Sequence, residues 1–339
     1  MRPSSGIEAL RKGLVLAKDL TILARSVMSG APYSTCLEFT NLCPIGCNCI
    51  WRRRGVPESQ MTDEEVLTFL YEQRKAGVVH IVLSGGEPYV RSKLLKRVLR
   101  ERIVKAYWVV TSGVIPMHTG LEGVMHFVSI DGLNQTHDTV RKSPGLFNKL
   151  WQNLTHARAT REFPVMAHMT INQLNMLEVD DVCRLLTETD ITDGLVCSTF
   201  TPSKANQETG LVLTDKMRAD IVEMLLQTKM RFGERLVMSK AAIERLHPDA
   251  TALQTPQNCL VAKYSRCYNS KGERIPICVI MQGEYVQQID KNGKPQQVFV
   301  QHVDCKDCGT IVNTMLNSAV NGILPDLETI FGLAQTLAV

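Results

Sequence analysis

The sequence predicts an α/β fold, a partial (β/α)6 barrel with a cysteine-containing C-terminal extension. Short apolar runs rich in β-branched residues alternate with helical patterns six times between residues 35 and 200. Parallel neighbouring strands need such crossover connections, so the alternation indicates a parallel sheet. Six units over about 170 residues are too few for a closed eight-stranded barrel. We therefore expect an open barrel whose ligands gather at the carboxyl ends of the strands.

Each element has a local signal in the sequence. Thr62-Asp-Glu-Glu65 is a capping box, which predicts a helix that continues to about Ala76 and stops before Gly77. Strands are expected at 35–40, 78–83, 107–111, 127–130, 165–171 and 194–200. Other helices are expected at 91–101, 145–160 and 176–187, and a helical pattern resumes over 213–246.

The chain divides into three expected parts: an N-terminal amphipathic helix at 1–30, the partial barrel at 31–250 and a cysteine-rich extension at 251–339. Apolar residues recur at helical spacing from Ile7 to Leu23, with basic residues between them. This pattern is typical of a helix packed on the body of the protein, and the alternative is a basic helix resting on a membrane surface. The boundary near residue 250 precedes five of the eleven cysteines.

The composition is that of a globular protein, with 44% hydrophobic and 21% charged residues. The net charge is +4 and the basic residues are scattered, so nucleic acid is not an expected partner. An odd number of unevenly clustered cysteines fits metal ligands better than a disulfide framework. Neither a signal peptide nor a transmembrane span is recognisable, so we expect a reduced, cytoplasmic protein.

Cys43, Cys47 and Cys49 form the most informative cluster in the sequence, directly after the first expected strand. Three thiolates on one short loop can hold a [4Fe–4S] cluster by three of its irons and leave the fourth iron open. Zinc is the alternative, but the loop offers no fourth ligand nearby. The spacing therefore favours an iron–sulfur centre.

A second motif, the turn Gly85-Gly86-Glu87-Pro88, follows the second expected strand. A glycine pair followed by a carboxylate can hold a small polar cofactor through backbone groups and charge. Because the carboxyl ends of parallel strands meet at one edge, we expect this turn to lie beside the cysteine loop.

Together these motifs resemble the radical S-adenosylmethionine (SAM) superfamily. Its members generally use Cys-x3-Cys-x2-Cys, whereas this chain has Cys43-x3-Cys47-x1-Cys49, one residue short in the second gap. The resemblance implies that SAM chelates the open iron through its amine and carboxylate, and that Gly85, Gly86, Glu87 and Pro88 bind the amino group. A reducing partner such as flavodoxin or ferredoxin is also implied.

Later strand ends resemble further SAM-binding segments of the superfamily. Ser112 follows the third expected strand, and Ser129 and Asp131 stand at the end of the fourth. The resemblance implies contacts with the ribose and methionyl carboxylate of SAM, with Thr170 and Asn172 as further candidates for the ribose. The alternative for each is a turn or cap residue. Downstream, His137-Asp138 and Arg141 stand at helical spacing, and we expect them to form caps or ion pairs.

The C-terminal cysteines form a second constellation. Cys259, Cys278, Cys305 and Cys308 are the expected ligands of an auxiliary iron–sulfur cluster, with Cys267 as an alternate. Structural zinc and plain buried thiols remain the alternatives.

The order of these C-terminal residues resembles the tail of the hopene-adenosylating radical SAM enzymes. The similarity to these enzymes extends over nearly the whole chain. This resemblance implies a 5′-deoxyadenosyl radical that adds to a double bond, or abstracts hydrogen, in a small-molecule, lipid or isoprenoid substrate. The N-terminal helix would then contact a membrane surface. Two alternatives stay open: a radical SAM enzyme that modifies a peptide or RNA with its auxiliary cluster, and a non-catalytic metal-binding module.

Overall fold

The computed structural model describes residues 32–47, 59–117, 124–160, 164–202, 209–252 and most of 254–276, together with 283–289, 295–301, Cys305 and Cys308. The helix expected at 1–30 lies outside the described residues, as do Cys49 and Cys278. In the part of the chain that is described, no helix has the length and apolarity needed to cross a bilayer.

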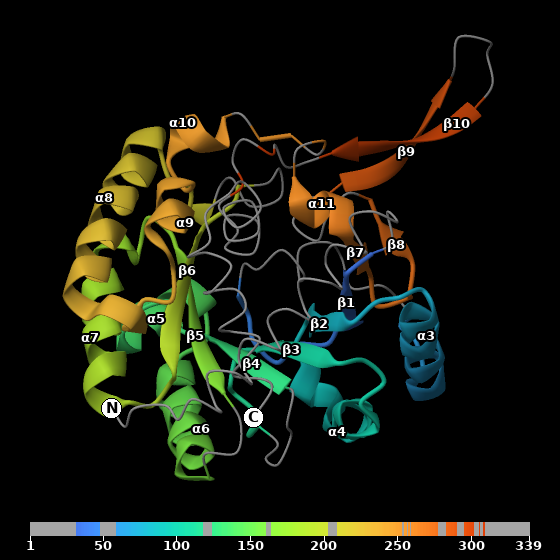
Figure 1. Ribbon diagram of the computed structural model, residues 1–339, viewed down its shortest axis with the longest axis horizontal. Coiled ribbons are helices and arrows are strands. Elements are labelled where there is room, and N and C mark those ends of the chain that lie inside the picture. The colour runs from blue at the N-terminus through green and yellow to red at the C-terminus, as the bar shows by residue number, and fades with distance from the viewer. Residues whose placement is uncertain are drawn as a thin grey trace, which may run out of the picture.

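The expected parallel sheet is confirmed. Its six strands stand in the spatial order β6-β5-β4-β3-β2-β1 and every neighbouring pair is parallel. The strands are β1 (Ser34–Thr40), β2 (His80–Gly85), β3 (Ala106–Thr111), β4 (Val124–Ser129), β5 (Val165–Ile171) and β6 (Gly194–Thr199). The fold is therefore the predicted partial barrel (Figure 1).

The sheet continues beyond β1 with residues from the expected extension. β7 (Ser265–Tyr268) pairs in parallel with β1, and β8 (Arg274–Ile275) pairs antiparallel with β7. Two further strands, β9 (Gly283–Ile289) and β10 (Pro295–Gln301), pair antiparallel in a sheet of their own. Part of the cysteine-rich region thus contributes to the barrel sheet.

Helices connect the strands and lie around the outside of the sheet (Figure 1). The capping box is present, because Thr62 N donates to Glu65 Oε2 at 2.7 Å and Glu65 N donates to Thr62 Oγ1 at 3.3 Å. The longer helices are α3 (Asp63–Lys75), α4 (Ser92–Glu101), α5 (Asn134–Arg141), α6 (Leu146–Thr160), α7 (Val179–Thr189) and α8 (Asp215–Phe232). Shorter ones are η1 (Pro88–Arg91), η2 (Met176–Glu178), η4 (Gly233–Arg235), α9 (Lys240–Glu244), α10 (Pro248–Thr251) and α11 (Leu260–Tyr264).

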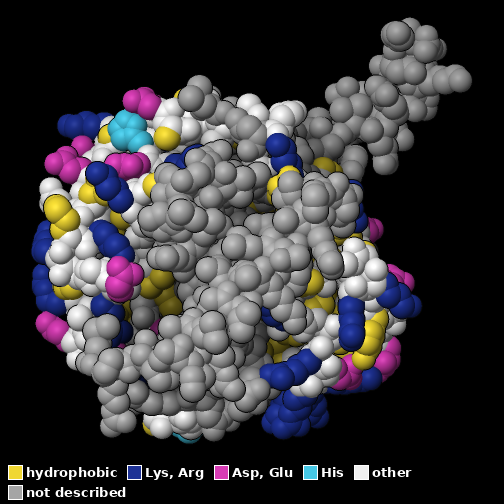
Figure 2. Space-filling model, viewed as in Figure 1, with side chains coloured by type: hydrophobic (Ala, Val, Ile, Leu, Met, Phe, Trp, Pro, Cys, Tyr) yellow, Lys and Arg dark blue, Asp and Glu magenta, His cyan; other side chains and the backbone are white. Residues whose placement is uncertain are grey.

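The two faces of the sheet differ in chemistry. Residues in register across parallel strands point to the same side. The helix-covered side carries fully buried apolar residues such as Leu37, Leu83 and Val109, which are partners in register. The other, concave side carries polar residues toward the strand ends, among them Glu38 and Ser84. Basic and acidic side chains are interspersed around the rim of the molecule in Figure 2.

Candidate active site at the carboxyl ends of the strands

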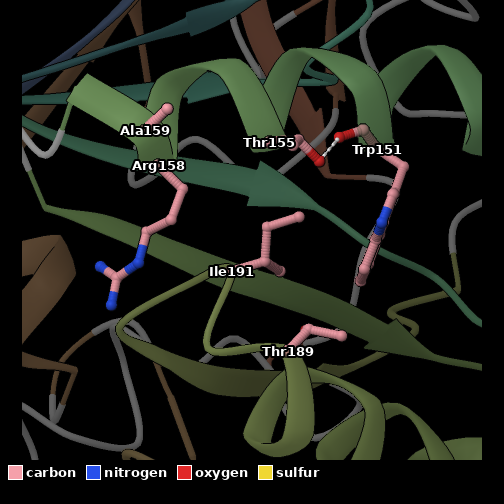
Figure 3. A pocket seen from close by; sticks show the side chains of 6 residues that line it. All are labelled: Trp151, Thr155, Arg158, Ala159, Thr189 and Ile191. Carbon is pink, nitrogen blue, oxygen red and sulfur yellow. Dashed lines mark hydrogen bonds between the residues drawn. The ribbon is translucent and has the colours of Figure 1, made fainter.

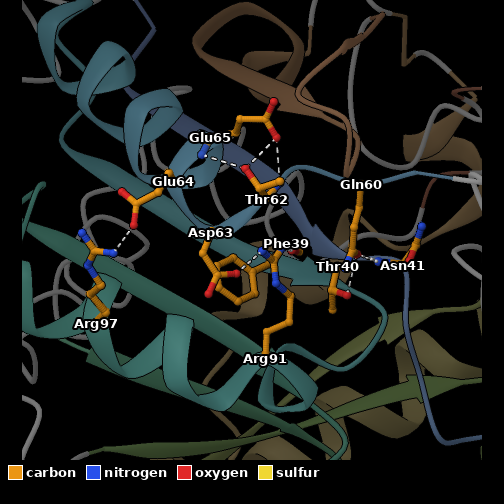
Figure 4. Close-up of polar contacts among 10 residues, drawn as sticks. All are labelled: Phe39, Thr40, Asn41, Gln60, Thr62, Asp63, Glu64, Glu65, Arg91 and Arg97. Atoms are coloured by element: carbon orange, nitrogen blue, oxygen red, sulfur yellow. Dashed lines mark hydrogen bonds and ion pairs between the residues drawn. The ribbon is translucent and has the colours of Figure 1, made fainter.

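The cysteine loop begins where β1 ends, and a single side chain fastens its base. Gln60 Oε1 accepts hydrogen bonds from Thr40 Oγ1 at 2.9 Å and from Asn41 N at 3.2 Å (Figure 4). Gln60 stands where the chain returns from the loop to α3. Both ends of the loop are therefore held together, which the sequence did not reveal because the partners are 20 residues apart.

Arg91 reinforces the same base from η1 (Figure 4). Its guanidinium donates to the carbonyl of Phe39 at 3.2 Å and to Asp63 Oδ1 at 2.5 Å. It also lies over the Phe39 ring, 5.6 Å from the centroid, at a distance typical of cation–π contacts. One cation thus joins β1, η1 and the start of α3.

Cys43 and Cys47 lie at the predicted edge of the sheet. Ile45, Cys47 and Leu146 form a small buried cluster, against which Cys43 and Val114 pack. None of the nine cysteines that the structure describes forms a disulfide. The loop therefore presents its described sulfurs as thiols beside the turn that follows β3.

The turn at Gly85–Pro88 contacts the cysteine loop directly. Gly86 N donates to the carbonyl of Thr40 at 2.7 Å, and Glu87 N donates to the carbonyl of Leu42 at 2.8 Å. A Cβ atom on Gly86 would lie 2.1 Å from the Leu42 oxygen, which no side chain can tolerate. Glycine is therefore required here so that the two backbones can approach each other.

The Glu87 carboxylate is buried and bonded within the chain. Oε1 accepts from Thr111 Oγ1 at 2.7 Å and Tyr89 N at 3.2 Å, and Oε2 accepts from Ser112 N at 2.8 Å and Ser112 Oγ at 2.5 Å. Four hydrogen bonds use the acceptor capacity of a carboxylate. Glu87 thus ties the end of β2 to the end of β3, and its contact with the amino group of SAM stays a prediction.

Asp131 performs a similar task after β4. Its carboxylate accepts from Arg141 Nε at 2.6 Å and from the backbone N of Thr170 at 2.8 Å, while the residue is 3% exposed. Asn172 binds the backbone of its own turn, through Leu174 N at 2.9 Å and the carbonyl of Thr170 at 3.0 Å. These bonds are what the turn-and-cap alternative expects. Roles of Ser129, Thr170 and Asn172 toward SAM stay predictions.

His137 lies beneath the same turn. Its Nδ1 accepts from Asp131 N at 3.0 Å, and the residue is fully buried. Burial, with the nearby positive charge of Arg141, lowers the pKa of His137 to about 4. The imidazole is therefore neutral and structural. The expected ion pair of Arg141 is present with Asp131, and Asp138 caps α6 through Phe147 N at 2.8 Å.

Two polar residues that sequence reasoning missed lie on neighbouring strands. His168 of β5 and Ser198 of β6 face each other, with Nε2 and Oγ 2.9 Å apart. The sequence did contain one signal for them, their alternation with buried apolar residues. It contained no signal for their contact, because 30 residues separate them.

The C-terminal cysteines are partly described. Burial raises the pKa of the Cys259 thiol, and the nearby Cys308 raises it further. Cys305 and Cys308 share a turn in which Cys308 N donates to the Cys305 carbonyl at 3.1 Å, whereas Cys267 lies on β7 in register with Cys36 of β1. Within the described residues no group of three or more metal-binding side chains is assembled. The auxiliary ligand set stays a prediction.

A surface pocket of about 450 Å³ lies on the opposite edge of the barrel (Figure 3). Arg158, which helps to line it, forms an ion pair with Asp193 at 3.3 Å. Asp193 in turn accepts a hydrogen bond from the N of Val165, the first residue of β5. The pocket therefore belongs to the amino ends of the strands and is separate from the predicted motifs. Its lining is Trp151, Thr155, Arg158, Ala159, Thr189 and Ile191.

Comparison with known proteins supports the fold. No family model matches the chain. It is 30% identical over 170 residues to the sporulation killing factor maturation protein SkfB of Bacillus subtilis, which is 46% of this chain and 40% of SkfB. It is also 30% identical over 174 residues to the AdoMet-dependent heme synthase of Methanosarcina barkeri, 48% of this chain and 49% of that protein. The chain thus matches less than half the length of these relatives.

The crystal structure of SuiB from Streptococcus suis, bound to precursor peptide SuiA, superimposes with a TM-score of 0.60. The match covers 76% of this chain and 62% of SuiB at 9% sequence identity. The similarity shows a shared fold across the barrel. None of the three names refers to hopene or to another lipid.

Proposed function

We propose that this chain, a member of the radical SAM superfamily, is an enzyme that cleaves SAM reductively and uses the resulting radical to modify a peptide. One observation carries the proposal. The cysteine loop and the Gly85–Pro88 turn form a single unit, because Gly86 N and Glu87 N both donate to carbonyls of the loop base. A cluster held by the loop and a cofactor held by the turn would therefore be neighbours.

The residues present fit an iron–sulfur cluster with an open iron. Cys43 and Cys47 are thiols at the carboxyl edge of the sheet, and Cys49 is the third proposed ligand. Three thiolates leave one of the four irons for the cofactor. When bound, the cluster supplies the electron that breaks a carbon–sulfur bond of the SAM sulfonium. The chain's part is to fix the loop through Gln60 and to fix the turn through Glu87.

A peptide is the proposed substrate because the relatives' names favour it. One is the maturation protein of the sporulation killing factor, and the fold neighbour SuiB was crystallised with its precursor peptide. The addition to an isoprenoid double bond, implied by the hopene-adenosylating resemblance, has no described residue in its favour. We further propose a reducing partner such as a flavodoxin or ferredoxin, and an auxiliary cluster at Cys259, Cys278, Cys305 and Cys308.

The test is anaerobic reconstitution of the full chain with iron and sulfide, then dithionite reduction with SAM and chromatography for 5′-deoxyadenosine. We expect product from the wild type and none from Cys43→Ala. Cys183 is a buried cysteine of α7 that lies away from the loop, so the Cys183→Ala variant should retain the activity. About four irons per chain indicate one cluster and about eight indicate two. A fully loaded wild type that forms no 5′-deoxyadenosine contradicts the proposal.

A further inference from the structure

His168 occupies a distinctive place on the concave side of the sheet. It is in register with Ser129 of β4, one of the residues predicted to contact SAM. Its sequence neighbours Ala167 and Met169 point the other way and are fully buried under the helices. His168 itself is only partly buried, as is Thr170 two positions further along the same side. The imidazole thus reaches the concave side near the strand ends.

One nitrogen of this imidazole is held and the other is available. Nε2 is 2.9 Å from Ser198 Oγ, so one of the two atoms donates to the other. Nδ1 of His168 has no hydrogen-bond partner among the described residues. In His80 and His137, by contrast, the corresponding unpartnered nitrogens are sealed from solvent. The Ser198 contact fixes the ring and leaves Nδ1 to bind something else.

The surroundings favour a neutral ligand. Burial lowers the pKa of His168 to about 4, with Asp131 acting against the shift and Arg141 acting with it, so the imidazole is neutral near pH 7. Among the described strand residues on the concave side, none is Lys or Arg and Glu38 is the one carboxylate. Such a face has little to offer an anion. It suits a group that hydrogen-bonds without charge.

The same side also carries aromatic side chains, of which Trp108 is partly buried and Phe127 is buried. Trp108 of β3 and Phe127 of β4 have ring centroids 5.0 Å apart, and Trp108 meets His80 at 4.5 Å. An uncharged hydrogen-bonding pair near the strand ends, above aromatic rings, matches a peptide segment with its amides and apolar side chains.

We propose that His168 and Ser198 form a substrate-binding pair that hydrogen-bonds a backbone amide of the peptide through His168 Nδ1. The pair would give the proposed enzyme a specific contact with its peptide substrate. This inference rests on the proposed function, which supplies the reaction. It borders residues predicted to contact SAM, because His168 is in register with Ser129 and Ser198 is in register with Thr170.

The binding test uses diethyl pyrocarbonate, which acylates neutral, accessible imidazoles, with mass spectrometry to locate each modified histidine. The reconstituted full chain is first saturated with SAM. We expect His168 to react, and a pool of terminally blocked random hexapeptides to slow its modification by roughly threefold or more. His156, exposed on α6, should react equally with and without peptide, and His137 should stay unmodified.

Three results overturn the inference. Protection of His168 by SAM alone makes it a cofactor contact, and protection by farnesol micelles without protection by peptides makes the substrate a lipid. Equal reactivity with and without peptides removes the binding role altogether.

A variant pair provides the kinetic readout. Loss of one neutral hydrogen bond predicts a fall of roughly 3- to 10-fold in peptide-stimulated 5′-deoxyadenosine formation by His168→Gln. SAM affinity should remain within about twofold, because a lost hydrogen bond would change it by more. His156→Gln should match the wild type in both. Should the wild type cleave no SAM while the peptides still protect His168, the proposed reaction fails and the binding pair stands. Unchanged stimulation in folded His168→Gln contradicts the pair.

Discussion

Replacement of Glu87 by glutamine isolates the tie between β2 and β3. Each carboxylate oxygen accepts from a backbone N–H that cannot turn around: Tyr89 N on Oε1 and Ser112 N on Oε2. Whichever way the glutamine amide is placed, its NH₂ group faces one of these N–H donors. The two hydroxyl partners, Thr111 Oγ1 and Ser112 Oγ, can rotate and adapt. The substitution thus loses a charge-assisted bond and buries an unsatisfied donor.

The expected cost follows from those two terms. A hydrogen bond to a charged group contributes roughly 1.5–3 kcal/mol, and an unsatisfied buried donor costs roughly 1–3 kcal/mol. The amide will choose the orientation that sacrifices the longer bond, to Tyr89 at 3.2 Å, so the lower half of the combined range applies. We expect Glu87→Gln to lower the free energy of unfolding by about 2.5–4 kcal/mol, measured by urea titration of the full chain without cluster.

Glu65→Gln is the matched control, since glutamine also completes a capping box on the exposed start of α3. Its urea midpoint should stay close to that of the wild type. SAM affinity of the reconstituted proteins is the second measurement. If Glu87→Gln kept wild-type stability and lost only SAM affinity, the carboxylate would be a ligand for the cofactor and would not tie β2 to β3.

Three other predictions follow from the same contacts. Gly86→Ala should lower the iron retained after reconstitution, because its Cβ would sit 2.1 Å from a carbonyl of the cysteine loop. His80 and His137 have pKa values of about 4, below the 6.5 of the unfolded chain. The free energy of unfolding should therefore rise with pH between about 4 and 6.5 and level off above. Urea titrations at a series of pH values should show this slope, and His80→Phe should reduce it. Arg141→Met should cost roughly 3–5 kcal/mol by leaving the buried Asp131 charge unpaired, and adding Asp131→Asn should recover part of the loss, as urea unfolding of both variants can show.

The sequence predicted all six parallel strands because their signals are local, although β2 lies two residues later and β4 begins three residues earlier than expected. β5 was expected and is found at 165–171, and α6 differs from its expected start by one residue. α7 begins at Val179 and not at 176, because the Asn172–Asn175 turn leads first into a 3-10 segment. Such boundaries depend on side-chain hydrogen bonds, which an apolar pattern does not contain.

What could not be predicted depends on pairing at long range. β7 is four residues long and mixes polar with apolar side chains, so nothing in it announces a strand. It becomes a strand because β1 offers an edge, which it joins with Thr35 opposite Arg266 and Cys36 opposite Cys267. The role of Gln60 could not be predicted either, because its hydrogen bond to Thr40 depends on a fold that brings residues 20 positions apart together.

Glu87 and Asp131 contribute to the site in a different way from His168. Glu87 joins β2 to β3 and Asp131 joins β4 to β5, so both carboxylates act by fixing where the backbone of the strand ends lies. A cofactor bound by that backbone would lose affinity together with stability when either is replaced. His168 makes one side-chain hydrogen bond, to Ser198, between two strands that their backbones already pair along nearly their whole length. Its replacement should therefore change the response to substrate while leaving both stability and SAM affinity in place, and this contrast separates the two groups experimentally.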